Sequence, residues 1–253
     1  MSPRSLDSRH TIARPERALL WLADPVLIWP VVLLVCALVA VHWLDLDMRL
    51  ADTLYRIEGG RWSLRYTWLT SEVLHKGSQR LSIVIGVVTL ATIVCSGFVG
   101  RLRPYRRGLV AAFAAAITSL LIVSLFKHQL PFACPYDMQR YGGKLAARSV
   151  SELFWHQDVS GCFPAGHAAG GYCFVVWFFF ARHYRLPYYG YVGLPGMVLG
   201  LVNGIDQQLR GAHFLSHDLS AILLCWVVGY AVFHGVVGRS PRVSHAALRK
   251  SSA

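Results

Sequence analysis

The chain has 253 residues, of which 55% are hydrophobic and 15% charged, and its formal net charge at pH 7 is +12. This composition is typical of an integral membrane protein and argues against a soluble all-helical domain, whose apolar segments would be interrupted by polar residues at helical spacing. The basic residues lie mostly in short turns between apolar runs, so the positive charge does not indicate binding to nucleic acid.

Six apolar runs of about 17 to 20 residues contain no Lys, Arg, Asp or Glu, and a helix of that length can cross the hydrocarbon core of a bilayer. They cover residues 25–44, 81–99, 108–126, about 163–181, 186–205 and 219–238. We therefore expect an all-α fold, a six-transmembrane-helix bundle over 25–238, between cytoplasmic segments at 1–24 and 239–253. The first run is too long for a signal peptide and is expected to remain as an anchor.

The distribution of lysine and arginine predicts the orientation of the helices. Six spans place both termini on one side, where 14 of these residues occur in 50 positions, against 11 in 86 positions on the other side. The denser side is expected to be cytoplasmic. In a bacterial cytoplasmic (inner) membrane, the loops 45–80, 127–163 and 206–218 then face the periplasm or the outside.

The first of these outer loops carries an apolar stripe. Trp62, Tyr66, Leu69 and Val73 recur at steps of four, three and four residues, which is the spacing of one helical face. The stripe predicts a helix that lies either on the membrane interface or against the bundle.

The second outer loop is rich in proline and glycine and is expected to be irregular. It contains Cys134 and Cys162, and because the loop faces an oxidising compartment we expect a disulfide between them, which would limit the freedom of the segment it closes. Three further residues of this loop are expected to be solvated surface groups: Arg148, His156 and Asp158.

Charged and titratable residues gather at helix ends on the same outer side. Lys127 closes the third predicted span, His167 opens the fourth, and the stretch LRGAHFLSHDL at 209–219 joins the fifth to the sixth. Ionisable residues that converge at helix ends on one side of a membrane indicate a functional site. These three segments can therefore share one site.

The residue types at these positions suit an anionic phosphate. Lys127, Arg140 and Arg210 supply positive charge, and a guanidinium can bind phosphate oxygens with two parallel hydrogen bonds. Gly166 and His167 stand at a predicted helix start, where free N–H groups favour an anion. No acidic cluster is present to hold Mg²⁺ or Ca²⁺, so neither a metal nor another cofactor is expected. One imidazole can attack phosphorus while another, protonated, donates to the leaving oxygen.

The three segments resemble the signature of the type 2 phosphatidic acid phosphatase (PAP2) superfamily, integral-membrane lipid phosphatases related to vanadium haloperoxidases. That signature reads K-x6-R-P, then P-S-G-H, then S-R-x5-H-x3-D. The chain has KHQLPFACP at 127–135, PAGH at 164–167 and RGAHFLSHD at 210–218. The resemblance covers a PAP2-like core of about 108–238.

The chain departs from this signature at several positions. Cys134 replaces the arginine of the first part, and Arg140 is the nearest candidate to substitute for it. Ala165 replaces a serine, although the backbone amides there can still contact phosphate. Arg210 stands three residues before His213 instead of six, which is about one helical turn, so it can face the same pocket if the stretch is helical.

The resemblance implies a role for each histidine. His213 is expected to be the nucleophile and His167 the acid for the leaving oxygen, with His217 and Asp218 orienting the nucleophile. Residues 213 and 217 share a face if this stretch is helical, so His217 remains an alternative nucleophile. Lys127, Arg140, Arg210 and Gly166 are expected to bind the phosphate.

We therefore expect a metal-independent membrane lipid phosphatase that acts at the outer face through a phosphohistidine, with the lipid bilayer and a lipid phosphate as partners. The sequence leaves the lipid open: isoprenoid diphosphate, lipid A, phosphatidate and phosphatidylglycerol phosphate all combine an apolar anchor with a phosphate. Two alternatives remain, a phosphotransferase between lipids and a non-catalytic lipid-binding or transport protein. Transporters usually place ionisable groups near the middle of the membrane, whereas here most lie at helix ends.

Overall fold

A computed structural model describes residues 23–130, 132–146 and 161–238. The terminal segments expected at 1–24 and 239–253 lie almost wholly outside the described residues. The expected surface groups Arg148, His156 and Asp158 also lie outside them. All regular elements of the described chain are helical, as expected, and the only extended pairing within it is an isolated bridge between Met138 and Leu145.

Four helices of the described chain are long and apolar enough to cross a membrane. They are α2 (Pro25–Trp43), the continuous helix Leu69–Cys95 formed by η2 (Leu69–Gly77) and α4 (Ser78–Cys95), the segment Arg103–Gln129 formed by η3 (Arg103–Tyr105) and α5 (Arg106–Gln129), and α11 (Leu215–Val237). Their apolar runs of 18 residues or more explain why they form as long helices.

The other two expected spans consist of shorter helices. One is divided into α7 (Gly166–Tyr172), η6 (Cys173–Val175) and α8 (Val176–His183), and the other into α9 (Tyr189–Val192) and α10 (Leu194–Leu209). Gly170 and Gly171 weaken the helix just before η6, and Pro195 stands in the first turn of α10. Four of the six expected spans are therefore helices long and apolar enough to cross a membrane, and the number of crossings stays a prediction.

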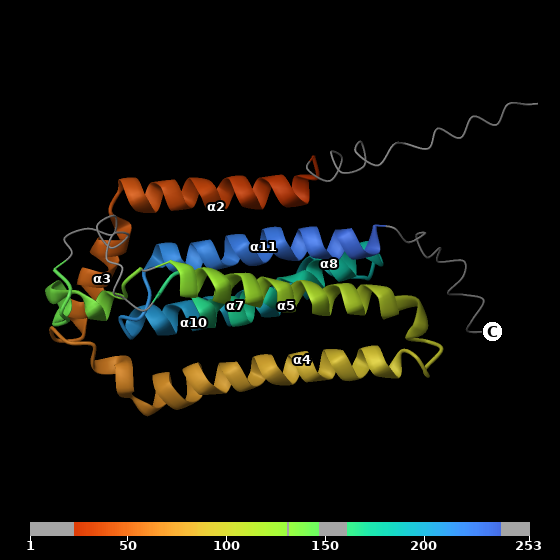
Figure 1. Ribbon diagram of the computed structural model, residues 1–253, viewed down its shortest axis with the longest axis horizontal. Coiled ribbons are helices and arrows are strands. Elements are labelled where there is room, and N and C mark those ends of the chain that lie inside the picture. The colour runs from red at the N-terminus through yellow and green to blue at the C-terminus, as the bar shows by residue number, and fades with distance from the viewer. Residues whose placement is uncertain (1–22, 131, 147–160, 239–253) are drawn as a thin grey trace, which may run out of the picture.

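The helices form a lengthwise bundle in which α2 and α4 flank the others (Figure 1). α11 packs against α5 and α2, and α10 packs against α7. The buried face of α5 is lined by small side chains, Ala111, Ala112, Ala115 and Ala116, which let neighbouring helices approach closely. α7 and α10 cross where Gly171 meets Gly200, because a Cβ at Gly171 would lie 2.2 Å from the Gly200 nitrogen.

One end of the bundle carries α3 (Leu46–Ile57) and the loop that follows α5, while the N-terminal end of α2 and the C-terminal end of α11 lie at the opposite end (Figure 1). A small core joins α3 to the loop after α5 and contains Met48, Ala51, Ala133, Met138, Tyr141 and Phe214. Asp47 of α3 accepts a hydrogen bond of 2.8 Å from the Ser216 N–H at the start of α11. α3 is thereby fastened to the beginning of α11.

The expected stripe from Trp62 to Val73 does not form one helix. η1 (Ser63–Tyr66) ends before η2 begins at Leu69, and Trp62 turns inward, where its ring packs against Tyr55 and Tyr141. Tyr66, Leu69 and Val73 are exposed, in keeping with a position at the membrane surface. The prediction of a continuous helix was wrong because tertiary packing draws Trp62 into the small core.

Candidate active site

Lys127 and His167 come together at the end of the bundle that carries α3. Lys127 lies in the last turn of α5, and its Nζ would lie 3.8 Å from a Cβ placed at Gly166, the first residue of α7. His167 follows directly, and the Asn203 side chain of α10 donates a hydrogen bond of 2.9 Å to its carbonyl. The Ala165 N–H donates to the His217 carbonyl at 3.2 Å. The segment around Gly166 is thereby joined to both α10 and α11.

His213 and His217 form a buried pair. His213 lies in the loop between α10 and α11, His217 lies in the first turn of α11, and their Nδ1 atoms are 3.4 Å apart. One of these nitrogens must carry the hydrogen of the contact, because two lone pairs would repel. Burial lowers the pKa of His213 well below its ordinary value, and the charge of Lys127 lowers it further. A neutral imidazole at His213 retains the lone pair that a nucleophile needs.

The ring of His217 is enclosed by aromatic side chains. Phe132, Phe163 and Phe214 all pack against it edge to face. Its Nε2 is buried and has no hydrogen-bond partner among the described residues. Its Nδ1 lies 3.4 Å from Nδ1 of His213, and the Cys162 backbone also acts on both rings as a hydrogen-bond partner.

Arg210 reaches the site from the end of α10. Its Nε donates to the Arg65 carbonyl at 3.1 Å, and its Nη1 lies 3.8 Å from the Asp206 carboxylate with no hydrogen-bond partner in the described chain. The stretch that follows is not helical, and Gly211 has φ +65°, which brings the chain against the Trp62 ring. The expected helical turn between Arg210 and His213 is therefore absent, and Arg210 occupies the C-cap of α10 instead.

Sequence reasoning missed several polar residues at this end of the bundle. The ring of His75, in η2, stacks on that of His167 with a centroid distance of 3.8 Å. Three more lie on the last turns of α10: Asn203, Asp206 and Gln207. Together with Arg210 they recur at steps of three, one and three residues, a helical polar face that could have revealed them.

An apolar cavity of about 530 Å³ begins at Lys127, Gly166 and His167 and continues between α4 and α5. Its lining includes Ile83, Val87, Leu90, Ala116, Ile117 and Phe174. A pocket that is apolar along its length and cationic at one end fits a molecule with an apolar body and an anionic head.

The model of the PAP2 superfamily matches residues 108–241, which is more than half of the chain. The chain belongs to the PAP2 superfamily. Comparisons with curated proteins and with solved structures give no significant match. Membership in the PAP2 superfamily implies phosphatase activity on lipid-like phosphates. The matched region contains the three segments that resemble the PAP2 signature, whereas α2, α3 and His75 precede it.

The structure does not bring Arg140 to the PAP2 histidines. Its guanidinium pairs with the Asp52 carboxylate, with Nε and Oδ1 2.7 Å apart, on the surface of α3. It lines a separate surface pocket with Arg49 and Arg56. The expectation that Arg140 folds back towards the phosphate fails because Asp52 and Tyr141, which also bonds Asp52, hold this loop against α3.

Asp218 also lies apart from the expected nucleophile. Its Oδ2 accepts a hydrogen bond from the Gln208 side chain, and its Oδ1 is buried without a partner in the described chain. Of the two expected orienting residues, the structure places His217 against His213 and directs Asp218 towards α10, where it packs against Gly204.

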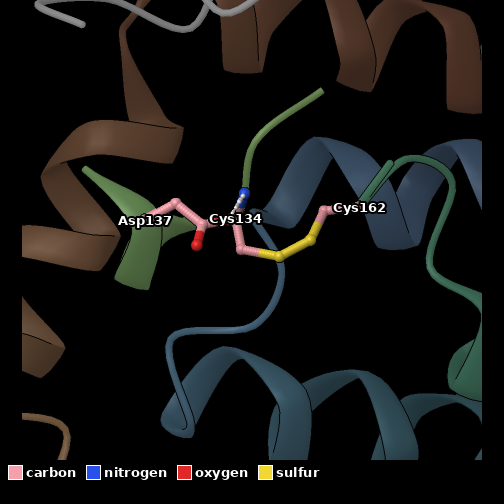
Figure 2. A group of neighbouring side chains, drawn as sticks. All are labelled: Cys134, Asp137 and Cys162. Atoms are coloured by element: carbon pink, nitrogen blue, oxygen red, sulfur yellow. Dashed lines mark hydrogen bonds between the residues drawn. A yellow bond between two sulfur atoms is a disulfide. The ribbon is translucent and has the colours of Figure 1, made fainter. Parts of the chain in front are cut away.

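The position of the missing PAP2 arginine is occupied by a disulfide between Cys134 and Cys162, as expected (Figure 2). The Cys134 N–H donates to the Asp137 carboxylate at 3.1 Å, and the neighbouring Tyr136 N–H donates to the Gly211 carbonyl at 2.9 Å. The second of these hydrogen bonds joins the loop directly after the first signature segment to the third segment. Because the two sulfurs bond each other, Cys134, Asp137 and Cys162 do not offer the ligand set of a metal site.

Proposed function

We propose that the protein is a metal-independent membrane lipid phosphatase that hydrolyses a phosphate monoester or diphosphate of a lipid through a phosphohistidine. The observation that carries this proposal is the apolar cavity that ends on Lys127, Gly166 and His167. A lipid tail can remain among apolar side chains while its phosphate meets the cationic end. A soluble phosphate ester would leave this apolar surface uncovered.

The histidine pair supports His213 as the nucleophile. When Nδ1 of His213 donates to Nδ1 of His217, the free lone pair of His213 lies on Nε2. That nitrogen attacks phosphorus, a P–N bond forms, and the P–O bond to the lipid breaks. His167 gives a proton to the departing lipid oxygen. The imidazolium of phosphorylated His213 continues to donate to His217, which takes the stabilising part of a carboxylate in a catalytic triad.

The second half-reaction restores the enzyme. His167, now neutral, accepts a proton from a water, and the oxygen of that water attacks phosphorus as the P–N bond breaks. Inorganic phosphate leaves and His213 is neutral again. Lys127 and Arg210 offset the charge on the phosphoryl oxygens in both steps, with backbone N–H groups at Gly166. Arg140 is not part of this proposal because it is bound to Asp52.

The bundle supports six membrane crossings. Gly166–His183 spans 18 residues and, at a rise of about 1.5 Å per residue, extends roughly 27 Å, close to the hydrocarbon thickness. Exposed aromatic side chains lie at both ends, Trp43, Tyr66 and Trp68 near the site and Tyr188, Tyr189 and Tyr191 at the other end. Such belts mark membrane interfaces. We infer that the termini are cytoplasmic and that the site faces the outside of a bacterial inner membrane.

Two assays test the function. Purified protein is given phosphatidate, phosphatidylglycerol phosphate, lipid A and an isoprenoid diphosphate in EDTA, and inorganic phosphate is measured. We expect release from at least one lipid and inhibition by orthovanadate, which mimics pentacoordinate phosphorus. Activity that disappears in EDTA and returns with a divalent ion would refute the metal-independent mechanism. Label that moves to a second lipid would identify a phosphotransferase, and no turnover of any lipid would favour a binding or transport protein.

The nucleophile is identified with ³²P-labelled lipid and alkaline trapping, which preserves phosphohistidine. His213→Ala is expected to abolish labelling, and His167→Ala to slow release so that label accumulates. Labelling that persists in His213→Ala but is lost in His217→Ala would transfer the role to His217. Retention of label in both variants would exclude this histidine pair as the source of the nucleophile.

A further inference from the structure

Two positions that carry arginine in the PAP2 signature lack it here. Cys134 takes the first and is locked in a disulfide. The second arginine stands six residues before the nucleophilic histidine, and in this chain that position is Gln207. Two cations remain: Lys127, which lies beside Gly166, and Arg210, and the charges of both act on the His167 ring. The phosphate pocket is therefore short of hydrogen-bond donors compared with its signature.

His75 lies where such a donor is needed. Its ring is stacked on His167 at a centroid distance of 3.8 Å with an interplanar angle of 24°. The charges of Arg210 and Lys127 act on it, so it lies within the same cationic group. It is presented by η2, a π-helical stretch, and such irregular turns within helices are frequent at functional sites.

Gln207 fixes which nitrogen of His75 carries the hydrogen. The Gln207 Nε2 lies 2.7 Å from the Asp206 carboxylate and 3.1 Å from His75 Nδ1. Asp206 is buried, and its carboxylate requires a donor, so the amide group must present its NH₂ side. The second amide hydrogen then points to His75 Nδ1, which accepts it. The His75 ring is then neutral with its hydrogen on Nε2, and Nε2 is a donor.

We propose that His75 is a phosphate-binding residue of this site and that Gln207 is its positioning residue, a pair that replaces the two missing arginines. This inference rests on the proposed function and adds a ligand to it: Nε2–H of His75 donates to a non-bridging oxygen of the phosphoryl group. The adjacent ring of His167 faces the leaving oxygen of the same group. Stacking keeps the two rings in register, so donor and acid act on one phosphorus.

The test compares three variants in detergent. His75→Leu removes the donor at similar size, His75→Gln keeps an N–H close to the position of Nε2, and His128→Ala is the control. His128 is an exposed histidine near the end of α5 whose Nδ1 contacts the Ser124 carbonyl. The measurements are KM for the best lipid substrate, the inhibition constant of orthovanadate, and the Kd of inorganic phosphate by calorimetry.

We expect His75→Leu to raise the vanadate constant and the phosphate Kd about 10- to 100-fold, the effect of losing a hydrogen bond to a charged group. His75→Gln should recover at least half of this change on a logarithmic scale, and His128→Ala should equal the wild type. A merely structural role for His75 would lower the melting temperature of both His75 variants and leave phosphate affinity per folded molecule unchanged. That result would overturn the proposal.

A double-mutant cycle tests Gln207. If Gln207 acts through His75, Gln207→Leu weakens vanadate binding in the wild type and has no further effect in His75→Leu. Additive effects would exclude the positioning role. The phosphate titration needs no turnover, so it distinguishes failure of the proposed function from failure of the inference about His75. Phosphate binding that depends on His75 without hydrolysis of any lipid would overturn the proposed function alone, and hydrolysis with phosphate affinity indifferent to His75 would overturn this inference alone.

Discussion

Replacing Gly171 by alanine would place a methyl group inside the crossing of α7 and α10. The new Cβ would lie 2.2 Å from the Gly200 nitrogen, whereas ordinary contacts begin near 3.4 Å, so the helices would have to separate by about 1.2 Å. Overpacking of this kind costs about 1–3 kcal/mol of folding free energy. The same movement would stretch the 2.9 Å bond between Asn203 and the His167 carbonyl beyond hydrogen-bonding reach, a loss of about 1 kcal/mol.

The assay for Gly171→Ala combines thermal unfolding in detergent with turnover of the best lipid substrate. The melting temperature should fall by about 2–4 °C per kcal/mol. Turnover should fall about 100-fold, because a displacement near 1 Å removes His167 from its working position. Gly229→Ala is the control, since its added Cβ meets nothing closer than 3.6 Å. A Gly171→Ala protein with the wild-type melting temperature and turnover would refute the close crossing.

Three further outcomes are expected. Arg140→Ala should leave kcat/KM unchanged and lower the free energy of unfolding by at most about 1 kcal/mol. Arg140 is half exposed, and among the acidic residues of the described chain it pairs only with Asp52. A large loss of activity would contradict this placement. Replacing Cys134 and Cys162 by serine should lower the unfolding free energy by about 3–4 kcal/mol, measured by denaturant titration against unreduced wild type, and equal stability would show that the disulfide does not form. Burial lowers the pKa of His213, so as the pH falls the unfolded chain binds a proton at this residue before the folded chain does. At pH values below about 6.5, the free energy of unfolding should therefore decrease by up to about 1.4 kcal/mol per pH unit. His213→Gln should flatten this dependence, and a variant with the wild-type pH profile would contradict the prediction.

Apolar runs predicted the long helices well because a bilayer-spanning helix needs little besides length and hydrophobicity. α2, α4, α5 and α11 lie close to their predicted ranges. The interruptions at η6 and before α10 were not predicted. Neighbouring Gly170 and Gly171 weaken one helix, and Pro195 starts another, but neither introduces a charge that would divide an apolar run.

The site was predictable where residues form a short-range pattern or stand at recognisable helix ends. His213 and His217 are four residues apart, and Lys127 and His167 stand at recognisable helix ends. His75 carries no pattern of its own, and its partner Gln207 is 132 residues away, so their contact arises from tertiary packing.

The prediction that Arg140 binds the phosphate failed for the opposite reason. Proximity in sequence to Pro135 suggested a role, but Asp52, 88 residues earlier, determines where its guanidinium lies. Long-range ion pairs of this kind leave no signal in a single sequence.

The hydrogen bond from Ser216 to Asp47 bears on how this enzyme could be divided or recombined. Asp47 caps the helix that carries His217, yet it lies well before the region that matches the family, which begins at residue 108. The Arg65 carbonyl, which holds Arg210, also precedes that region. A fragment limited to 108–241 would therefore expose the first turn of α11 and release Arg210. Exchange of segments between family members should take residues 45–80 together with the signature segments, because the two parts complete one working unit.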